Sequence, residues 1–344
     1  MRTWHRAALG LALVYAATGC HETPLEPDAD QTITLKPMAA EISMEVVDLG
    51  TLGGSYSEAR GLNARGQVVG VSRRSDYRDH AFLWEDGVMT DLGTLGGISS
   101  SATGINARGQ IIGDSYTERF ETHPFLYENG VMTDLGTLGG TLARATAINN
   151  RGQIVGVSRT VSGELHAFLW EQGVMSDLGH LGSGFSYAIG ISESGEVAGY
   201  SQTAGGEYHA VIWNKGGMRD LGMLGGDRAS AHDINPRGQV VGEIWGPGYV
   251  HRVFLWHDES LLDLTPDGSD YAYSPSINAA GKICFTAHGP DGAASYVWSK
   301  GNLIRLPSLV DGGYTRVYDI NARGDAAGLS ATSTYSHAVL WRRN

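Results

Sequence analysis

One stretch of sequence sets the pattern for most of the chain: residues 48–90 read DLGTLGGSYSEARGLNARGQVVGVSRRSDYRDHAFLWEDGVMT. Its turn asparagine recurs every 43 residues, giving the column Asn63, Asn106, Asn149, Ser192, Asn235, Asn278 and Asn321. An aromatic column has the same period, with one spacing shortened to 42: Trp84, Tyr127, Trp170, Trp213, Trp256, Trp298 and Trp341. Such a period indicates an array of similar supersecondary units, which we number one to seven.

Each unit is predicted to contain four short strands. In unit one these are residues 59–62, 67–72, 81–84 and 88–92. Turns at 63–66 and 85–87 join them, each ending in a glycine that suits a tight connection. The strands are apolar at successive positions, as expected when both faces are covered. Four-stranded units of this length that cover one another describe the blades of an all-β propeller.

The two ends of the array predict a closed ring. The chain stops three residues after Trp341, so unit seven lacks a fourth strand. Residues 44–49, MEVVDL, match the fourth-strand text VMTDL at 88–92. We therefore predict a seven-bladed β-propeller over residues 44–344, with the N-terminal strand closing the last blade, since closure removes unpaired sheet edges. The rival architecture is an open β-solenoid.

The first 43 residues have a different character. Arg2 and Arg6 precede an apolar run over residues 7–17, too short to span a bilayer and typical of a secretory signal peptide. The following Ala-Thr-Gly-Cys resembles a bacterial lipobox, which predicts a lipoprotein signal peptide over 1–19 and acylation of Cys20. Ala17 in place of leucine leaves ordinary signal cleavage as the alternative. Polar residues 20–43 then form a flexible tether, and the protein is exported, either anchored at the outer membrane or cell surface or secreted.

Composition restricts the partners. The net charge is −12 and only 25 residues are Lys or Arg, which argues against nucleic acid and against adsorption to anionic lipid. Membrane contact is therefore expected only through the Cys20 lipid, and the protein is expected to be a monomer. If Cys20 is acylated, Cys284 has no disulfide partner. Cys284 lies in an apolar run and is predicted to be a small buried hydrophobe rather than a reactive thiol.

The text HAFLWEDGVMTDLGTLGG at residues 80–97 resembles the HAF repeat of bacterial extracellular proteins, named for the words His80-Ala81-Phe82 and His166-Ala167-Phe168. The resemblance covers residues 44–344 and implies surface exposure or secretion and a propeller-like fold. It implies no defined activity, so no catalytic residues follow from it. Units five and six replace the HAF word with RVF at 252–254 and ASY at 294–296, so their surfaces are expected to be specialised.

Histidines recur in the third strand, as His80, His123, His166, His209 and His337. On different blades they cannot converge on one metal ion, whose ligating nitrogens must lie about 2 Å away. We expect each histidine instead to make a hydrogen bond that ties its strand to a neighbouring loop. No metal site and no cofactor are predicted, and no nucleotide-binding or HExxH motif is present.

The connections between strands two and three, and between strand four and the next unit, differ in every unit and share one face of a propeller. Variable loops on a rigid scaffold suit binding, and these are rich in tyrosine. Aromatic rings there can stack on sugars or grip a protein, although variable loops can also simply tolerate tyrosine. The candidate ligand-binding residues are Trp245, Tyr249, His251, Tyr271, Tyr273, Phe185, Tyr187 and Tyr314.

We accordingly predict a non-catalytic binding or scaffold protein that engages an envelope protein or a polysaccharide through this loop-rich face, and not an enzyme. The alternative is a secreted glycan-active hydrolase or lyase using the same face, which a pair of acidic residues near the propeller axis would favour. A purely structural surface protein is the third possibility.

Overall fold

The structure, a computed structural model, describes residues 44–343 apart from residue 291, and only the backbone of Tyr249. The predicted signal peptide, the Cys20 acylation and the tether lie outside these residues. The described chain is all-β with a single 3-10 turn, η1 (Pro247–Tyr249). None of its elements is a helix long and apolar enough to cross a membrane.

The strands follow the repeat. After β1 (Met44–Asp48), the units contain β2 (Gly53–Leu62), β3 (Val68–Arg74), β4 (Asp79–Glu85), β5 (Val88–Asp91); β6 (Gly96–Ile105), β7 (Ile111–Thr117), β8 (Thr122–Glu128), β9 (Val131–Asp134); β10 (Gly139–Ile148), β11 (Ile154–Thr160), β12 (Leu165–Glu171), β13 (Val174–Asp177); β14 (Gly182–Ile191), β15 (Val197–Thr203), β16 (Tyr208–Asn214), β17 (Gly217–Gly222); β18 (Arg228–Ile234), β19 (Val240–Trp245), β20 (His251–His257), β21 (Ser260–Asp263); β22 (Tyr271–Ile277), β23 (Ile283–Gly289), β24 (Gly292–Ser299), β25 (Asn302–Arg305); and β26 (Thr315–Ile320), β27 (Ala326–Ala331), β28 (Ser336–Arg343).

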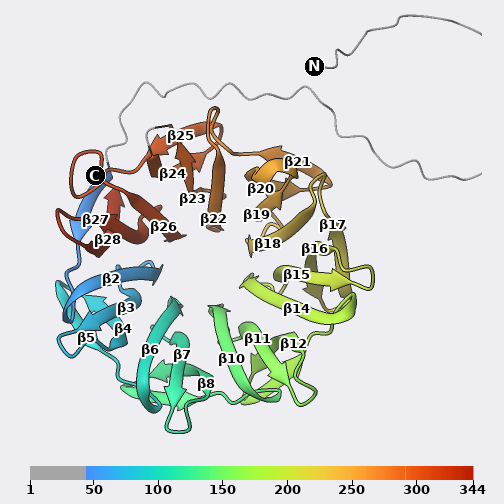
Figure 1. Cartoon of the computed structure of the whole chain (residues 1–344), viewed down its shortest axis with the longest axis horizontal. Coiled ribbons are helices and arrows are strands. Elements are labelled where there is room, and N and C mark those ends of the chain that lie inside the picture. The colour runs from blue at the N-terminus through green and yellow to red at the C-terminus, as the bar shows by residue number, and fades with distance from the viewer. Residues whose placement is uncertain (1–43, 291, 344) are drawn as a thin grey trace, which may run out of the picture. The chain divides into compact units, whose positions relative to one another are not determined.

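Strands within a unit pair antiparallel in chain order, so that β2, β3, β4 and β5 form one sheet. The first strand of each unit lies nearest the centre of the assembly and the later strands lie farther out (Figure 1). The prediction of an all-β, repeat-built, propeller-like architecture is confirmed. The predicted first strand was too short: β2 begins at Gly53, not at residue 59.

Apolar residues from neighbouring units form the core between them. Val69 and Ala81 of unit one pack with Ala102, Ile111 and Phe125 of unit two, all of them buried. The same kind of cluster joins unit seven to unit one. It contains Ala327, Ala338 and Leu340 together with Ala59, Leu62, Val68, Phe82 and Trp84. Each sheet is therefore covered on both faces, which explains the near-continuous apolar runs in the sequence.

The repeated asparagines tie each turn to the next unit. The side-chain amide of Asn63 donates to the carbonyl oxygen of Asn106 at 3.1 Å, and Asn106 donates to that of Asn149 at 3.1 Å. Asn321 of the last unit donates to the carbonyl oxygen of Asn63 of the first, also at 3.1 Å. These amides are buried, so each bond satisfies a donor that water cannot reach.

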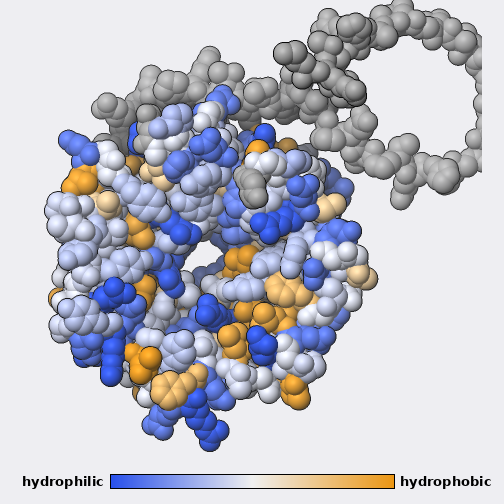
Figure 2. Space-filling model, viewed as in Figure 1, coloured by the Kyte–Doolittle hydropathy of each residue, from blue (hydrophilic) through white to orange (hydrophobic). Residues whose placement is uncertain are grey.

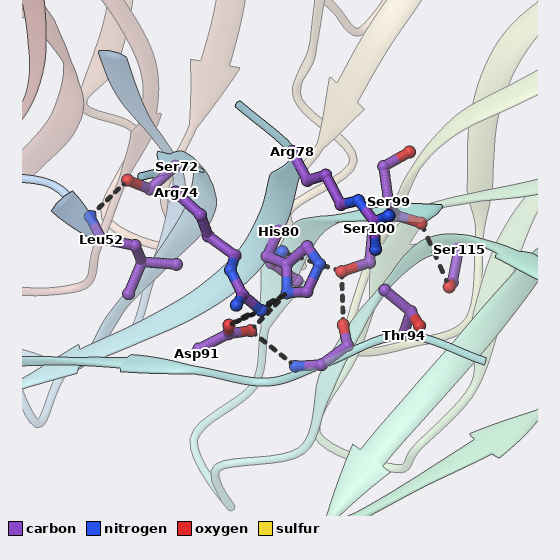
Figure 3. A network of polar contacts seen from close by, with 12 residues as sticks. Leu52, Ser72, Arg74, Arg78, His80, Asp91, Thr94, Ser99, Ser100 and Ser115 are labelled. Atoms are coloured by element: carbon purple, nitrogen blue, oxygen red, sulfur yellow. Dashed lines mark hydrogen bonds and ion pairs between the residues drawn. The ribbon is translucent and has the colours of Figure 1, made fainter. Parts of the chain in front are cut away.

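Each repeated histidine is bonded to an aspartate in the outermost strand of its own sheet. His80 Nδ1 lies 2.8 Å from Asp91, and Figure 3 shows His80 and Arg74 both directed at that carboxylate. Asp91 also accepts the backbone N–H of Gly93 at 2.8 Å and so fixes the turn into the next unit. The predicted hydrogen bond is therefore present, but its partner is the end of the fourth strand rather than a neighbouring loop. Among the residues of the described ranges, no group of His, Cys, Asp or Glu could hold a metal ion.

The N-terminal strand pairs with the C-terminal one. β1 runs antiparallel to β28, with Val46 opposite Trp341 and Asp48 opposite Val339. The backbone N–H of Ala338 donates to the Ser57 hydroxyl at 2.8 Å, as that of Ala81 does to the Ser100 hydroxyl at 2.9 Å between units one and two. The contacts between the last and first units thus repeat those between interior units.

Cys284 is a free, fully buried cysteine, as predicted. Burial raises the pKa of its thiol well above the ordinary value, which suits a packing role rather than a nucleophile.

Candidate functional site: an aromatic pocket beside the central channel

A pocket of about 580 Å³ lies between units four and five. One wall comes from the strands β14, β15 and β16, and the other from β18 and β19. The side chains that line it are Thr146, Phe185, Tyr187, Ile189, Tyr200, Tyr208, Arg228, Ala229, Ser230, His232, Glu243 and Trp245. Its size and its mixture of aromatic and polar groups are typical of small-molecule and sugar sites.

Four aromatic rings form the unit-four wall. Because side chains alternate along β14, Phe185 and Tyr187 face the pocket while Ser186 is buried on the other side. Tyr187 stacks on Tyr200 with ring centroids 5.6 Å apart, and Phe185 meets Tyr208 edge-on at 5.8 Å. Burial raises the pKa of Tyr200 to about 12, so its hydroxyl stays protonated and can donate a hydrogen bond near neutral pH.

The unit-five wall is built on Trp245. The His251 ring meets Trp245 at 4.5 Å, and the Arg228 guanidinium lies over the indole at 4.6 Å, a cation–π contact. Burial lowers the pKa of His251, so this imidazole is neutral near pH 7. This wall therefore presents an indole together with one exposed positive charge.

Polar groups at the base of the pocket gather around His232. Its Nε2 lies 2.9 Å from the Ser230 hydroxyl and 3.6 Å from Glu243 Oε1. A Ser–His–acid triad requires the serine and the acid on different imidazole nitrogens, whereas here both lie on the same one. Glu243 is buried and accepts the backbone N–H of Ser274 at 2.8 Å, which helps to hold units five and six together. The cluster is suited to orienting a ligand, not to activating Ser230.

The pocket opens onto a central channel. A second cavity of about 360 Å³ shares Thr146, Ile189 and His232 with it. This cavity is lined by the same repeat position of every unit, occupied by Arg60, Thr103, Thr146, Ile189, His232, Pro275 and Tyr318. In unit one, Arg60 stands at a β-bulge between the paired residues Ala59 and Gly61, a device that redirects a side chain. Figure 2 shows the opening at the centre, with hydrophobic residues gathered on the side where β14 lies and hydrophilic residues around the rest of the rim.

Two aspartates lie in this channel. Asp233 and Asp319 occupy the repeat position held by Gly61 in unit one, and both contact the hydroxyl of Ser276, at 2.9 and 3.3 Å. Burial raises both pKa values, that of Asp319 to about 6. A single hydroxyl proton can satisfy only one of the two carboxylates, so the arrangement favours retaining a proton on the pair.

The same aspartates also connect units. Asp233 Oδ2 accepts the backbone N–H of Ile277 in unit six at 2.9 Å, and Asp319 Oδ2 accepts that of Leu62 in unit one at 3.0 Å. An acidic pair near the axis is the feature that the sequence analysis associated with an enzyme, and here it is partly engaged in holding the fold.

The predicted site residues form two groups. Phe185, Tyr187 and Trp245 line the aromatic pocket, and His251 supports it through Trp245. The remaining three described side chains belong to units six and seven and do not line it. Tyr271 stacks on Tyr273 with ring centroids 5.9 Å apart, and burial, followed by hydrogen bonding to Tyr314, raises the pKa of Tyr273.

Tyr273 of this second group lies beside Arg316, whose guanidinium is 5.0 Å from the Tyr273 ring and 4.7 Å from the ring of Tyr318, a residue that was not predicted. For Tyr249, the structure places only the backbone, in η1. Several tyrosines assigned to loops lie within strands, among them Tyr187 in β14 and Tyr271 in β22.

Sequence reasoning missed Tyr200, Arg228, His232 and Glu243. A signal for two of them was available in the repeat alignment. Tyr200 and Glu243 stand at the position of Val71 in unit one and Val157 in unit three, both buried valines. A polar or aromatic residue at a position that is apolar in other units marks a place where that unit departs from its packing role.

No family model and no curated protein matches the chain. Solved structures do match in fold. The puromycin-hydrolyzing peptidase of Mycobacterium tuberculosis has a TM-score of 0.59 at 12% identity, over 84% of this chain and 51% of that chain. The Pyrococcus horikoshii acylaminoacyl peptidase gives 0.59 at 12%, over 85% and 52%. The WD40 β-propeller domain of Doa1 gives 0.51 at 13%, over 87% and 97%. The fold is thus a β-propeller, and the chain spans about half the length of the two peptidases.

These structures correct one prediction. The sequence analysis predicted that the chain is not an enzyme, but structures that share its fold include peptidases. That prediction is therefore wrong: it rested on the absence of catalytic motifs and on a resemblance that implies no defined activity, and neither of these excludes catalysis. At 12–13% identity the likeness shows the fold alone, and it transfers no catalytic residue to this chain.

Proposed function

We propose that the protein is a seven-bladed propeller that binds a polysaccharide in the aromatic pocket between units four and five. The blade count is supported by the seven-fold repeat and by the antiparallel four-strand order within units. Closure is supported by the pairing of β1 with β28 and by the bonds from Asn321 to Asn63 and from Leu62 to Asp319. The Asn321–Asn63 bond repeats the asparagine bonds between interior units, and the Leu62–Asp319 bond repeats the bond from Ile277 to Asp233. Contacts at the last junction that are equivalent to those between interior units support a ring without free sheet edges.

The observation that carries the binding proposal is the composition of the pocket walls. Flat aromatic rings at Tyr187 and Trp245 offer apolar faces on which the C–H face of a sugar can stack. Arg228, His232 and the tyrosine hydroxyls supply donors for sugar hydroxyl groups. A shared rim with the channel leaves room for a chain longer than one sugar.

The cellular setting belongs to the same proposal. The Ala-Thr-Gly-Cys word before residue 21 and the HAF-like repeats both support an exported protein, held to a membrane by a lipid on Cys20 or secreted. A polysaccharide of the cell envelope or of the extracellular matrix is then the available ligand. Substitution of Cys20 by serine should release the protein from the membrane fraction, and unchanged fractionation would refute the lipid anchor.

The test is binding of the purified protein to fractionated envelope and extracellular polysaccharides, with released reducing ends recorded in the same wells. Tyr187→Ala and Trp245→Ala should each weaken binding at least about tenfold, the scale expected for an aromatic anchor. Tyr335→Ala, an exposed tyrosine in unit seven outside the pocket, is the matched control and should bind normally. Binding that survives both pocket substitutions would refute this site.

A second candidate function, cleavage of the bound glycan, is favoured by Asp233 and Asp319. They lie in the channel that continues from the pocket, and the raised pKa of Asp319 beside a second carboxyl is a feature that acid–base cleavage of glycosidic bonds uses. New reducing ends that disappear in Asp319→Asn would establish cleavage. Binding without new ends would assign the pocket to recognition only.

A further inference from the structure

The aromatic pocket is flanked by two exposed arginines, one from unit three and one from unit five. Arg144 is on β10 and Arg228 is on β18, the first strands of the units on either side of β14. Both side chains are exposed, and within the described residues neither makes an ion pair. The charge of Arg144 acts on Tyr187, and Arg228 itself lines the pocket. Free guanidinium groups thus flank the stacking surface of a protein whose net charge is −12.

The acids near the pocket and channel are occupied elsewhere. Glu58 is buried and paired with Arg60 at 2.7 Å. Glu243 is buried against Ser274, and Asp114 accepts the backbone N–H of Ala145 at 2.9 Å. Burial raises the pKa of Asp114 to about 7 although the nearby Arg144 charge opposes the shift, so this carboxyl is only partly ionised near neutral pH. Arg144 is therefore only partly compensated, by Asp114, and Arg228 makes no ion pair within the described residues.

Arg316 is a third arginine that makes no ion pair within the described residues. Arg316 on β26 stands at the repeat position of Arg144, half-buried between the rings of Tyr273 and Tyr318. It donates to the Ser274 hydroxyl at 3.1 Å, while its buried Nε has no partner among the described residues. A polymer with repeated charges could contact Arg316 as well as the two arginines at the pocket.

From this arrangement we propose that the ligand is an acidic polysaccharide whose uronate carboxylates pair with Arg144 and Arg228 while its rings stack on Tyr187 and Trp245. The inference rests on the proposed polysaccharide binding and specifies its chemistry. A guanidinium presents two parallel N–H donors that match the two oxygens of a carboxylate. A uronic acid carries that carboxylate and a stackable ring in one residue, so it fits both features of the pocket.

The experiment compares polygalacturonate and alginate with the same polymers after chemical reduction of their carboxyl groups. Calorimetry with the full chain should show the carboxylated polymers binding at least about tenfold more tightly than their reduced forms, and losing affinity as salt rises from about 50 to about 300 mM. Arg144→Gln and Arg228→Gln should each weaken binding of the carboxylated forms and leave that of the reduced forms unchanged. Arg119→Gln, which removes one exposed charge away from the pocket, should alter neither.

The outcomes separate the two proposals. Equal affinity for carboxylated and reduced polymers would overturn the acidic-ligand inference and leave polysaccharide binding intact. Failure to bind either form, with Tyr187→Ala and Trp245→Ala also without effect on any polysaccharide tested, would overturn both. Partial recovery of carboxylate binding in Arg228→Lys, relative to Arg228→Gln, would support a charge contact at this position.

Discussion

His337 in the last strand lies 3.0 Å from the carboxylate of Asp48 in the first, although 289 residues separate them in sequence. In unit two the same pair, His123 and Asp134, is only 11 residues apart at 2.9 Å. The same type of His–Asp contact thus has two roles. In unit two it stabilises a local hairpin, and in the last sheet it joins the two ends of the described chain.

This difference predicts unequal effects of the same substitution. Asp48→Ala should lower the urea midpoint of unfolding more than Asp134→Ala does. Asp134 ends β9, which follows its pairing partner β8 directly through a tight turn, whereas β1 is distant in sequence from β28 and is held in the sheet by its contacts with β28 and the adjoining core. Urea unfolding followed by tryptophan fluorescence measures both midpoints, and equal shifts would show that the last sheet does not depend on β1.

Unit four lacks one of the repeated asparagine hydrogen bonds, and a substitution can restore it. Ser192 replaces asparagine in unit four, so no side-chain amide reaches the carbonyl oxygen of Asn235 as Asn149 reaches that of Ser192, at 3.0 Å. Ser192→Asn should add that hydrogen bond and raise the free energy of unfolding by about 1 kcal/mol, the usual net value of such a bond. Ser192→Ala is the control and should destabilise. No gain from asparagine would mean that unit five lies too far from this turn.

Asp114 should make stability depend on pH. Its folded-state pKa of about 7 lies above the ordinary 3.8, so the folded state holds the proton more tightly than the unfolded state does. This contribution is favourable at low pH and is lost as pH rises through about 7; the shift corresponds to at most about 4 kcal/mol.

Asp114→Asn, which keeps an oxygen to accept the Ala145 N–H, should therefore flatten the decline in unfolding free energy between about pH 5 and about pH 8. Asp233 and Asp319 also have raised pKa values and would leave a residual slope. Urea titrations at the two pH values measure the change. An identical slope in wild type and variant would show that Asp114 is not the titrating group.

Cys284 should be chemically silent in the folded protein. Its thiol is fully buried and its pKa is raised, so thiolate is scarce and reagent cannot reach it. In a Cys20→Ser background, a disulfide reagent should label Cys284 only after urea is added. Labelling under native conditions at a rate independent of urea would contradict the packing of unit six.

The repeat period by itself predicted the architecture because each unit must bury the same apolar runs against its neighbours. The recurring spacing from Asn63 to Trp84 placed the turns at 63–66 and 85–87 to within one residue, but it ended the second strand at residue 72 and began the third at 81, whereas β3 ends at Arg74 and β4 begins at Asp79. The start of β2 was missed because residues 53–58, GGSYSE, have no apolar alternation. Their extended conformation depends on pairing with β3, where Ser57 lies opposite Ser72 and Gly53 opposite Arg74.

The candidate site depended on contacts that the linear sequence does not display. Phe185, Tyr187 and Trp245 were selected because they depart from the repeat, but Tyr271 and Tyr273 depart in the same way and belong to another cluster. Which rings share a pocket is set by strand order and by the angle between neighbouring units. Arg228 was missed because an arginine in a sequence carries no sign of whether an acid will lie beside it.

The sequence alone determined that the chain is a repeat-built, all-β protein, and it assigned the recurring histidines and asparagines to structural roles. Those conclusions follow from periodicity, because a residue required in every unit must serve what every unit does. Only the tertiary structure showed which of the residues that depart from the repeat lie close to one another. It brought Tyr187, Tyr200, Arg228, His232 and Trp245 to one pocket, because the side chains on facing strands of two neighbouring units meet only once the sheets are packed.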